Sequence, residues 1–152
     1  MPKIVSINHT DPVIRTHMLF IQVSLAAMKY ADSRFYREHH LSMIKYIALK
    51  VLLLNGGTMK HSELARWTNT KKHNITTLVD RMKEEKFVTT QRSTKDKRVI
   101  EITLTDKGRE TYEKSSPDAR DIVKELMHGV NERDIRNFEK ILLKVKTNIE
   151  KV

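Results

Sequence analysis

The sequence predicts a mainly α fold of the α+β class, in which a short β-ribbon is set among helices. Apolar residues recur every three or four positions near both ends and in the middle of the chain, as in helices that bury one side. Two β-prone runs, one opened by Val88 and one from Val99 to Leu104, flank a polar turn. The length of 152 residues fits one domain, or one core with helical extensions.

The first predicted element is a helix near the amino terminus. Its apolar stripe suits packing against another helix and consists of Ile14, Met18, Ile21, Leu25 and Met28. A second helix is predicted for residues 42–55, with Ser42 as its N-cap and Gly56 beyond its end.

A helix, a turn and a further helix are predicted next. Residues 62–68 form the first helix, and Asn69-Thr70 suits a tight turn because Asn tolerates the left-handed conformation. The second helix runs from about residue 71 to residue 85. Its buried stripe consists of Ile75, Leu78, Val79 and Met82.

The polar side of this second helix carries cationic and hydrogen-bonding side chains. They suit the base edges and phosphates of a DNA major groove, although a solvated helix in any helical domain has a similar face. We predict that His73, Asn74 and Thr77 read bases, with Thr76 beside them, and that the phosphate contacts include Lys71, Lys72 and Arg81.

The β-ribbon that follows has a basic tip. Asp96 lies two residues before Arg98, and a carboxylate there can fix the aim of the guanidinium. An arginine held in this way can enter a narrow DNA minor groove, with Lys95 and Lys97 adding attraction to phosphates. Alone, the ribbon fits an ordinary solvated hairpin equally well. Together with the preceding helix pair it indicates a winged helix–turn–helix.

Two more helices are predicted after the ribbon. One begins at Asp106 with Thr105 as N-cap, and Pro117 is predicted to interrupt or kink it. After the break at 129–131 comes the last helix, with an apolar stripe of Ile135, Phe138, Leu142, Val145 and Ile149.

The stripes at the two ends predict the domain organisation. We expect residues 1–40 and 106–152 to form a helical dimerisation region, and residues 41–105 to form a winged helix–turn–helix DNA-binding domain. The alternative is that each stripe packs on its own domain.

The distribution of charge agrees with binding to nucleic acid. The formal net charge is +10, and residues 58–98 carry 11 Lys/Arg against 5 Asp/Glu. Residues 99–152 carry 11 of each, so a dimer interface there would escape self-repulsion. A basic helix and ribbon fit a phosphate-binding surface better than a membrane anchor.

From Leu41 to Gly108 the chain resembles the MarR family of bacterial transcription regulators. It aligns without a gap between Glu63 and Gly108, and the wing motif followed six residues later by Leu-Thr-x-x-Gly is specific to that family. The matching residues are Glu63-Leu64-Ala65, Ile75, Leu78-Val79-Asp80-Arg81, Phe87-Val88, Asp96-x-Arg98 and Leu104-Thr105-x-x-Gly108. The resemblance implies an obligate homodimer, with the wing arginine in the minor groove and the second helix in the major groove.

Four positions depart from the family pattern. Lys45 stands where the family usually has Gln. Lys71 replaces a helix-capping Ser, so Thr70 becomes the predicted cap. Lys86 replaces a glycine, and a left-handed conformation there costs about 1 kcal/mol. Thr90 replaces a common Arg, and Arg92 is predicted to take over its phosphate contact.

Several other classes of protein and site are disfavoured. No nucleophile–base pair or paired carboxylates occur at motif spacing, so we expect no catalysis and no cofactor. Without cysteine there are no disulfides, thiol sensors or thiolate ligands. Asp32 with His39 and His40 is the candidate metal cluster, but adjacent histidines diverge on a helix and we expect no metal. No signal peptide or membrane span is visible.

These observations favour a homodimeric, sequence-specific transcriptional regulator that acts on the nucleoid in the cytoplasm. A regulator of this class is usually a repressor. We expect it to bind a pseudo-palindromic operator in double-stranded DNA and to be released by a small-molecule effector bound between the helical and winged-helix parts. The alternative is an architectural or protein-binding winged helix that uses charge without reading sequence.

Overall fold

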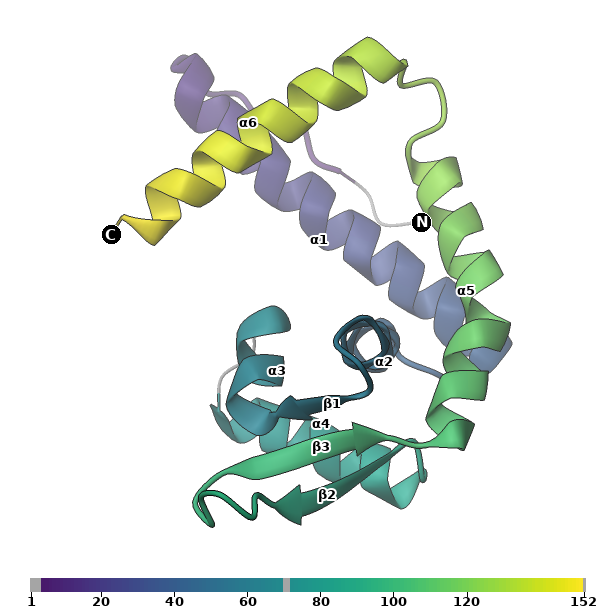
Figure 1. Cartoon of the computed structure of the whole chain (residues 1–152). Helices are drawn as coiled ribbons and strands as arrows, with labels where there is room; N and C mark the ends of the chain where they lie inside the picture. Colours follow the sequence, from purple (N-terminus) through teal and green to yellow (C-terminus); the bar gives the residue numbers. More distant parts are fainter. Residues whose placement is uncertain (1–3, 70–71, 152) are drawn as a thin grey trace. The chain divides into compact units, whose positions relative to one another are not determined.

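A computed structural model describes residues 4–69 and 72–151, with only the backbone described for Lys72 and His73. The chain divides into two compact units, residues 1–120 and 121–152. Within the part described, no helix is long and apolar enough to cross a membrane. The fold is mainly helical with one small antiparallel sheet, as the sequence predicts (Figure 1).

The first two helices are α1 (Pro12–His39) and α2 (Met43–Leu54). Asp11 caps α1 by accepting hydrogen bonds from the backbone N–H groups of Val13 and Ile14. At α2, Ser42 occupies the N-cap position as predicted, but its side chain makes no capping hydrogen bond. Asp32 of α1 caps α2 instead, because its Oδ1 accepts the Met43 N–H at 2.7 Å.

The sheet has three strands: β1 (Thr58–Lys60), β2 (Val88–Arg92) and β3 (Ile100–Leu104). β3 lies in the middle and pairs antiparallel with both neighbours. The β2–β3 hairpin is the predicted ribbon. β1 is not predicted from the sequence, so the predicted two-stranded ribbon is the larger part of a three-stranded sheet.

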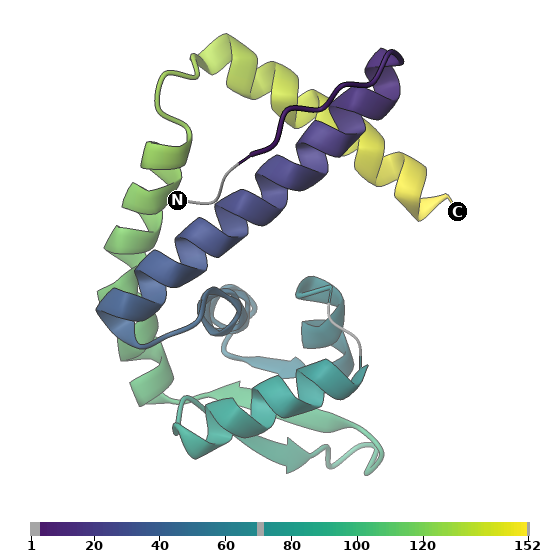
Figure 2. The ribbon, with the colours of Figure 1, turned by 180° about the vertical axis from the view of Figure 1, so that it is seen from behind.

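Helices α3 (His61–Trp67) and α4 (Lys72–Glu84) form the predicted helix–turn–helix. Asn69 in the turn has φ 47°, the left-handed conformation expected of it. The predicted cap residue Thr70 lies outside the described residues. Helix α4 covers one face of the sheet (Figures 1 and 2).

The predicted core stripe of α4 is confirmed in three of its four positions. Ile75, Val79 and Met82 are buried, whereas Leu78 is half-buried. They share a core with Leu49 of α2, Leu64 of α3 and Ile102 of β3, each completely buried. This core fixes the orientation of α4, so the polar side of the helix faces away from it.

The last two helices are α5 (Asp106–Leu126) and α6 (Glu132–Glu150). Thr105 caps α5 as predicted, its Oγ1 accepting the Gly108 N–H at 3.0 Å. Of the two outcomes predicted for Pro117, interruption of the helix was wrong, since α5 continues through it, and a kink stays a prediction. Proline removes only one N–H donor and its fixed φ is helical, while Ala119 and Ile122 beyond it are anchored in buried positions.

Candidate nucleic-acid interface

The predicted reading side of α4 is exposed. Asn74, Thr76, Thr77 and Arg81 are all accessible on its surface, because the apolar positions between them are held by the core. Three of the predicted contact residues, Lys71, Lys72 and His73, have side chains outside the described residues. The accessible groups are two hydroxyls, one amide and one guanidinium, which are hydrogen-bonding groups suited to base edges and phosphates.

The wing tip is built by a local contact between Asp96 and Arg98. One carboxylate oxygen, Oδ1 of Asp96, accepts the backbone N–H of Arg98 at 2.9 Å and its Nε–H at 3.3 Å. The Arg98 side chain is 92% exposed. The carboxylate therefore holds both the backbone and the root of the guanidinium while the rest of the side chain projects into solvent.

The remaining basic residues of the wing are also accessible. Lys95 and Lys97 are exposed at the tip. Arg92, at the end of β2, donates from Nη1 to the carbonyl oxygen of Lys97 at 3.0 Å. The tip is closed further by Ser93, whose N–H bonds to the Val99 carbonyl, and by a turn from the Val99 N–H to the Asp96 carbonyl. Four cationic side chains thus stand on a tip that its own hydrogen bonds define.

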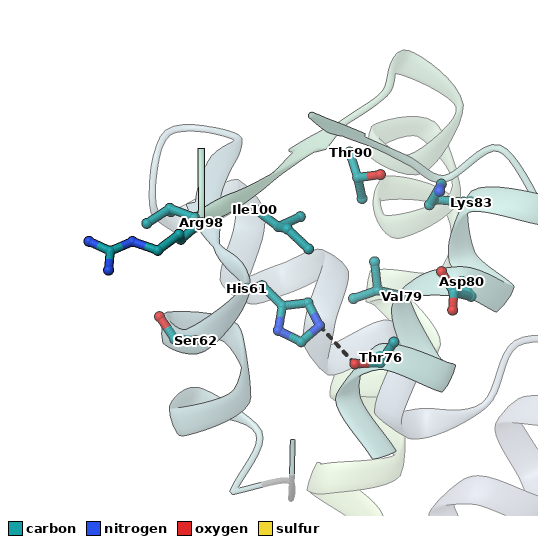
Figure 3. Close-up of a pocket in the computed structure, with 10 residues that line it drawn as sticks. His61, Ser62, Thr76, Val79, Asp80, Lys83, Thr90, Arg98 and Ile100 are labelled. Carbon is teal, nitrogen blue, oxygen red and sulfur yellow. Dashed lines mark hydrogen bonds between the residues drawn. The ribbon is translucent and has the colours of Figure 1, made fainter. Parts of the chain in front are cut away.

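A cavity of about 460 Å³ lies between α3, α4 and the wing. Val79 of α4 and Ile100 of β3 line it, with the polar side chains of Thr90, Asp80 and Lys83 around them (Figure 3). At one side, His61 of α3 and Thr76 of α4 approach with Nε2 and Oγ1 at 3.4 Å. Arg98 borders this cavity but its guanidinium points away from it.

A second cavity of about 390 Å³ separates α2 from the other flank of α4. Its lining includes Lys45, Asn74, Thr77 and Arg81. Three of the predicted DNA-contact residues therefore lie on one groove, and Lys45, a departure from the family pattern, joins them.

Lys45 forms an ion pair that the sequence did not reveal. Its Nζ lies 2.5 Å from Oε1 of Glu85, just past the end of α4, and only 13% of the Lys45 side chain is exposed. The second oxygen, Oε2 of Glu85, is buried without a hydrogen-bond partner among the described residues. The pair ties α2 to the end of the helix that carries the candidate contact residues.

The same corner contains the predicted left-handed Lys86, with φ 62°. Thr105 holds this corner because its Oγ1 donates to the carbonyl oxygen of Lys86 at 2.7 Å. Lys107 of α5 donates from Nζ to the Glu85 carbonyl at 2.8 Å. Residues from α2 and α5 therefore both contact the end of α4, which offsets the backbone strain.

The predicted dimerisation stripes are exposed in the single chain. In α1, Ile14, Met18 and Ile21 are 41–44% exposed and Leu25 is 67% exposed. Helix α6 has no buried residue among those described. The exposed stripe residues of that helix are Ile135, Phe138, Leu142, Val145 and Ile149.

The three residues of the candidate metal cluster are not brought together. Asp32 caps α2, and His40 forms the left-handed C-cap of α1. His39 instead meets Asp118 of α5, with Nε2 and Oδ2 2.7 Å apart.

Tyr46 of α2 lies in an aromatic cluster close to this pair. It packs edge-on against Phe35 of α1 and stacks on Tyr112 of α5, with ring centroids 5.0 and 5.3 Å apart. Burial raises the pKa of the Tyr46 phenol, and the neighbouring Tyr112 adds to this, while a hydrogen bond from Ser116 lowers it. Helices α1, α2 and α5 therefore meet in one packed aromatic cluster.

Comparison with known proteins connects this geometry to transcription regulators. A family model described as transcriptional regulator SarA/Rot matches residues 33–115, more than half of the chain. The HTH-type transcriptional repressor IacR of Pseudomonas putida is 27% identical over 76% of this chain and 73% of its own length. The aligned segments span 57–73% of the length of the three curated relatives, less than two thirds in two of them.

Solved structures give the same fold. AbsC, a MarR family regulator from Streptomyces coelicolor, superposes with a TM-score of 0.86 at 21% identity, covering 97% of this chain and 100% of its own. Sco3205 of the same organism, solved in complex with DNA, gives a TM-score of 0.82 at 19% identity over 90% of this chain and 88% of its own. The chain has the winged helix–turn–helix fold of MarR regulators, as predicted, and it belongs to the SarA/Rot family of transcriptional regulators.

Proposed function

We propose that the protein is a homodimeric repressor that reads a pseudo-palindromic operator in double-stranded DNA. The wing tip is the observation that carries the proposal: one oxygen of Asp96 bonds both the backbone and the side chain of Arg98, which is 92% exposed. The contact with the Arg98 N–H occurs in ordinary turns, whereas the added contact with the Arg98 Nε–H directs the side chain, as insertion of an arginine into a minor groove requires. A repressor role is supported by the similarity to the transcriptional repressor IacR.

In this proposal some residues of the interface contact bases and others contact phosphates. Asn74 and Thr77, with His73 and Thr76 beside them, read base edges from α4. The phosphate contacts come from the cations around them: Lys71, Lys72, Arg81, Arg92, Lys95 and Lys97. Arg98 enters the minor groove, and Asp96 orients it.

Dimerisation uses the apolar stripes of α1 and α6, and the dimer spaces two recognition helices about one turn of DNA, ~10 bp, apart. We assign residues 1–40 and 106–152 to the dimerisation region and residues 41–105 to the DNA-binding domain. The protein acts in the cytoplasm on the nucleoid. Release by a small molecule is supported by two structural neighbours, one bound to 2,4-dichlorophenol and one regulated by 6-hydroxynicotinic acid.

Genomic footprinting followed by competition with random DNA tests the proposal. A sequence-specific repressor protects discrete sites and holds them against about a 10³-fold excess of random DNA. Asn74→Ala and Thr77→Ala should each cost about 1–3 kcal/mol on the operator and relax the preference at one position. Thr147→Ala on α6 serves as the control and should change neither.

Equal competition by random DNA would contradict the proposal. So would unchanged base preference in both α4 variants, because that helix would then not be the reader. Either result would favour an architectural protein that binds by charge alone.

A further inference from the structure

The far end of α1 and the middle of α5 bring together three potential metal ligands. Glu38 and His39 end α1, and Asp118 faces them from α5. One ligand atom from each lies within 4.8 Å of the other two. Within residues 4–69 and 72–151, these are the three potential metal ligands whose ligand atoms lie this close together. It differs from the cluster considered from the sequence, because Asp118 is 79 residues from His39.

The charges in this group favour a bound cation. Two carboxylates converge on one imidazole, and like charges this close disfavour each other unless positive charge offsets them. The Arg34 guanidinium, 3.6 Å from Glu38, offsets one of them, and an ion bound among the three ligands offsets both. An ordinary His–Asp pair uses one carboxylate, and Asp118 already provides it at 2.7 Å. The contact between His39 and Asp118 is complete without Glu38, so Glu38 adds a second anionic ligand.

The distance between His39 and Asp118 is close to that between two ligands of one ion, and the ligand atom of Glu38 lies within 4.8 Å of both. Zinc binds histidine nitrogen and carboxylate oxygen at about 2.0–2.2 Å, so two ligands of a tetrahedral site lie ~3.3 Å apart. His39 and Asp118 would have to separate by only about half an ångström to admit the ion. The side chain of Asp118 is 44% exposed, which leaves an entry path and a fourth position for water.

Neighbouring side chains hold two of the three ligands in place, as they do in known metal sites. Arg34, one turn before Glu38, places its Nε 3.6 Å from Oε1 of that residue and orients it. The His39 ring packs against Phe35, with centroids 4.8 Å apart, and Phe35 is completely buried. The packing against Phe35 thus fixes the imidazole ring, and its Nε2 faces Asp118.

We propose that Glu38, His39 and Asp118 form a binding site for a divalent transition metal ion of the zinc class. An imidazole with two carboxylates, in a chain without cysteine, suits Zn²⁺ and its first-row neighbours better than Mg²⁺ or Ca²⁺. The ion clamps α1 to α5 at the joint where Phe35 also contacts Tyr46 of α2. This site goes beyond the proposed DNA binding and does not depend on it.

Cobalt binding to the full-length, tag-free protein tests the proposal after treatment with a chelator. Co²⁺ replaces Zn²⁺ and absorbs visible light when coordinated, so a titration gives both stoichiometry and affinity. We expect one ion per chain, displaced by Zn²⁺. Glu38→Gln, His39→Asn and Asp118→Asn should each weaken binding by at least the 10–100-fold seen for supporting residues of metal sites. Zn²⁺ should also raise the melting temperature of the wild type.

Matched controls keep the result interpretable. His40→Asn and Asp121→Asn remove the same side-chain types from positions outside the cluster and should leave cobalt binding unchanged. Glu38→Gln alters an exposed residue and leaves the His39–Asp118 contact in place, so it remains informative if the other variants unfold. The proposal is overturned if the wild type binds no cobalt at micromolar concentration, or if Glu38→Gln binds as well as the wild type.

Discussion

The winged-helix elements bury their apolar residues within the chain, whereas α6 leaves its apolar residues exposed. Leu49, Leu64, Ile75 and Ile102 of the first region are fully buried within one chain. Helix α6 has an equally regular stripe, yet Phe138 is 44% and Leu142 37% exposed. Monomeric proteins rarely leave a long row of large apolar side chains uncovered. The first region is thus complete in one chain, whereas the second is the one to which we assign a partner surface.

The largest effect should come from breaking the stripe of α6. Leu142→Lys places a charge in it, and we expect the dimer to dissociate. The winged-helix core should survive, because it does not depend on that residue. DNA affinity should fall by about 10²–10⁴-fold, the factor lost when two linked sites act separately. Sedimentation and operator titration measure the two effects.

Leu143→Lys is the control for this change. Leu143 is 54% exposed and lies outside the stripe, about 100° around the helix from Leu142, so the variant should remain a dimer. If Leu142→Lys is also dimeric and binds normally, the stripe is not the interface.

The next largest effect should come from a substitution at Gly108, which destabilises the winged-helix region. A Cβ at this position would lie 2.2 Å from the backbone oxygen of Phe87. Gly108→Ala should therefore destabilise the fold by about 3 kcal/mol, since overpacking against backbone cannot relax. Gly129→Ala meets open space but has φ +81°, so about 1–2 kcal/mol is expected there. Urea unfolding followed by circular dichroism compares the two, and equal losses would show that the close approach does not matter.

A smaller effect is expected at the α2–α4 corner. Lys45→Met leaves Glu85 without its partner, but the Glu85 side chain is 40% exposed, so the loss should be about 1–2 kcal/mol rather than the larger cost of a fully buried charge. Adding Glu85→Leu should restore part of it, because contacting residues are not additive. The exposed pair Lys124–Asp121 is the control, and Lys124→Ala should cost less than half as much. Additive losses at Lys45 and Glu85 would show that the pair is not coupled.

The smallest effect is a pH dependence at Tyr46. Burial raises the pKa of this phenol above its usual 10.0, so the folded protein favours the neutral form. The stabilisation is present below pH 10, the pKa of the unfolded chain, and is lost as pH rises through the folded pKa. Tyr46→Phe should flatten the alkaline loss of stability in urea unfolding. Tyr36→Phe, at an exposed position, should retain it.

The sequence predicted the local contacts of the fold better than the distant ones. Thr105 caps the next helix from three residues away, and Asp96 contacts Arg98 from two residues away. Both contacts follow from spacing alone. The Lys45–Glu85 and His39–Asp118 pairs span 40 and 79 residues, so only the folded chain brings them together. Strand β1 was missed because three residues, Thr58–Lys60, are too few to show a period.

The sign of the Asp96→Ala effect on operator affinity tests the central claim most directly. Charge alone predicts tighter binding, because the variant removes a negative group beside DNA. If Asp96 holds Arg98 for insertion, Asp96→Ala should bind the operator more weakly, by about as much as Arg98→Ala, with the double variant losing far less than the sum. Lys97→Ala, a control at the same tip, should lose less and mainly at low salt. Tighter binding of Asp96→Ala would mean that the wing tip is a solvated turn and not an aimed arginine.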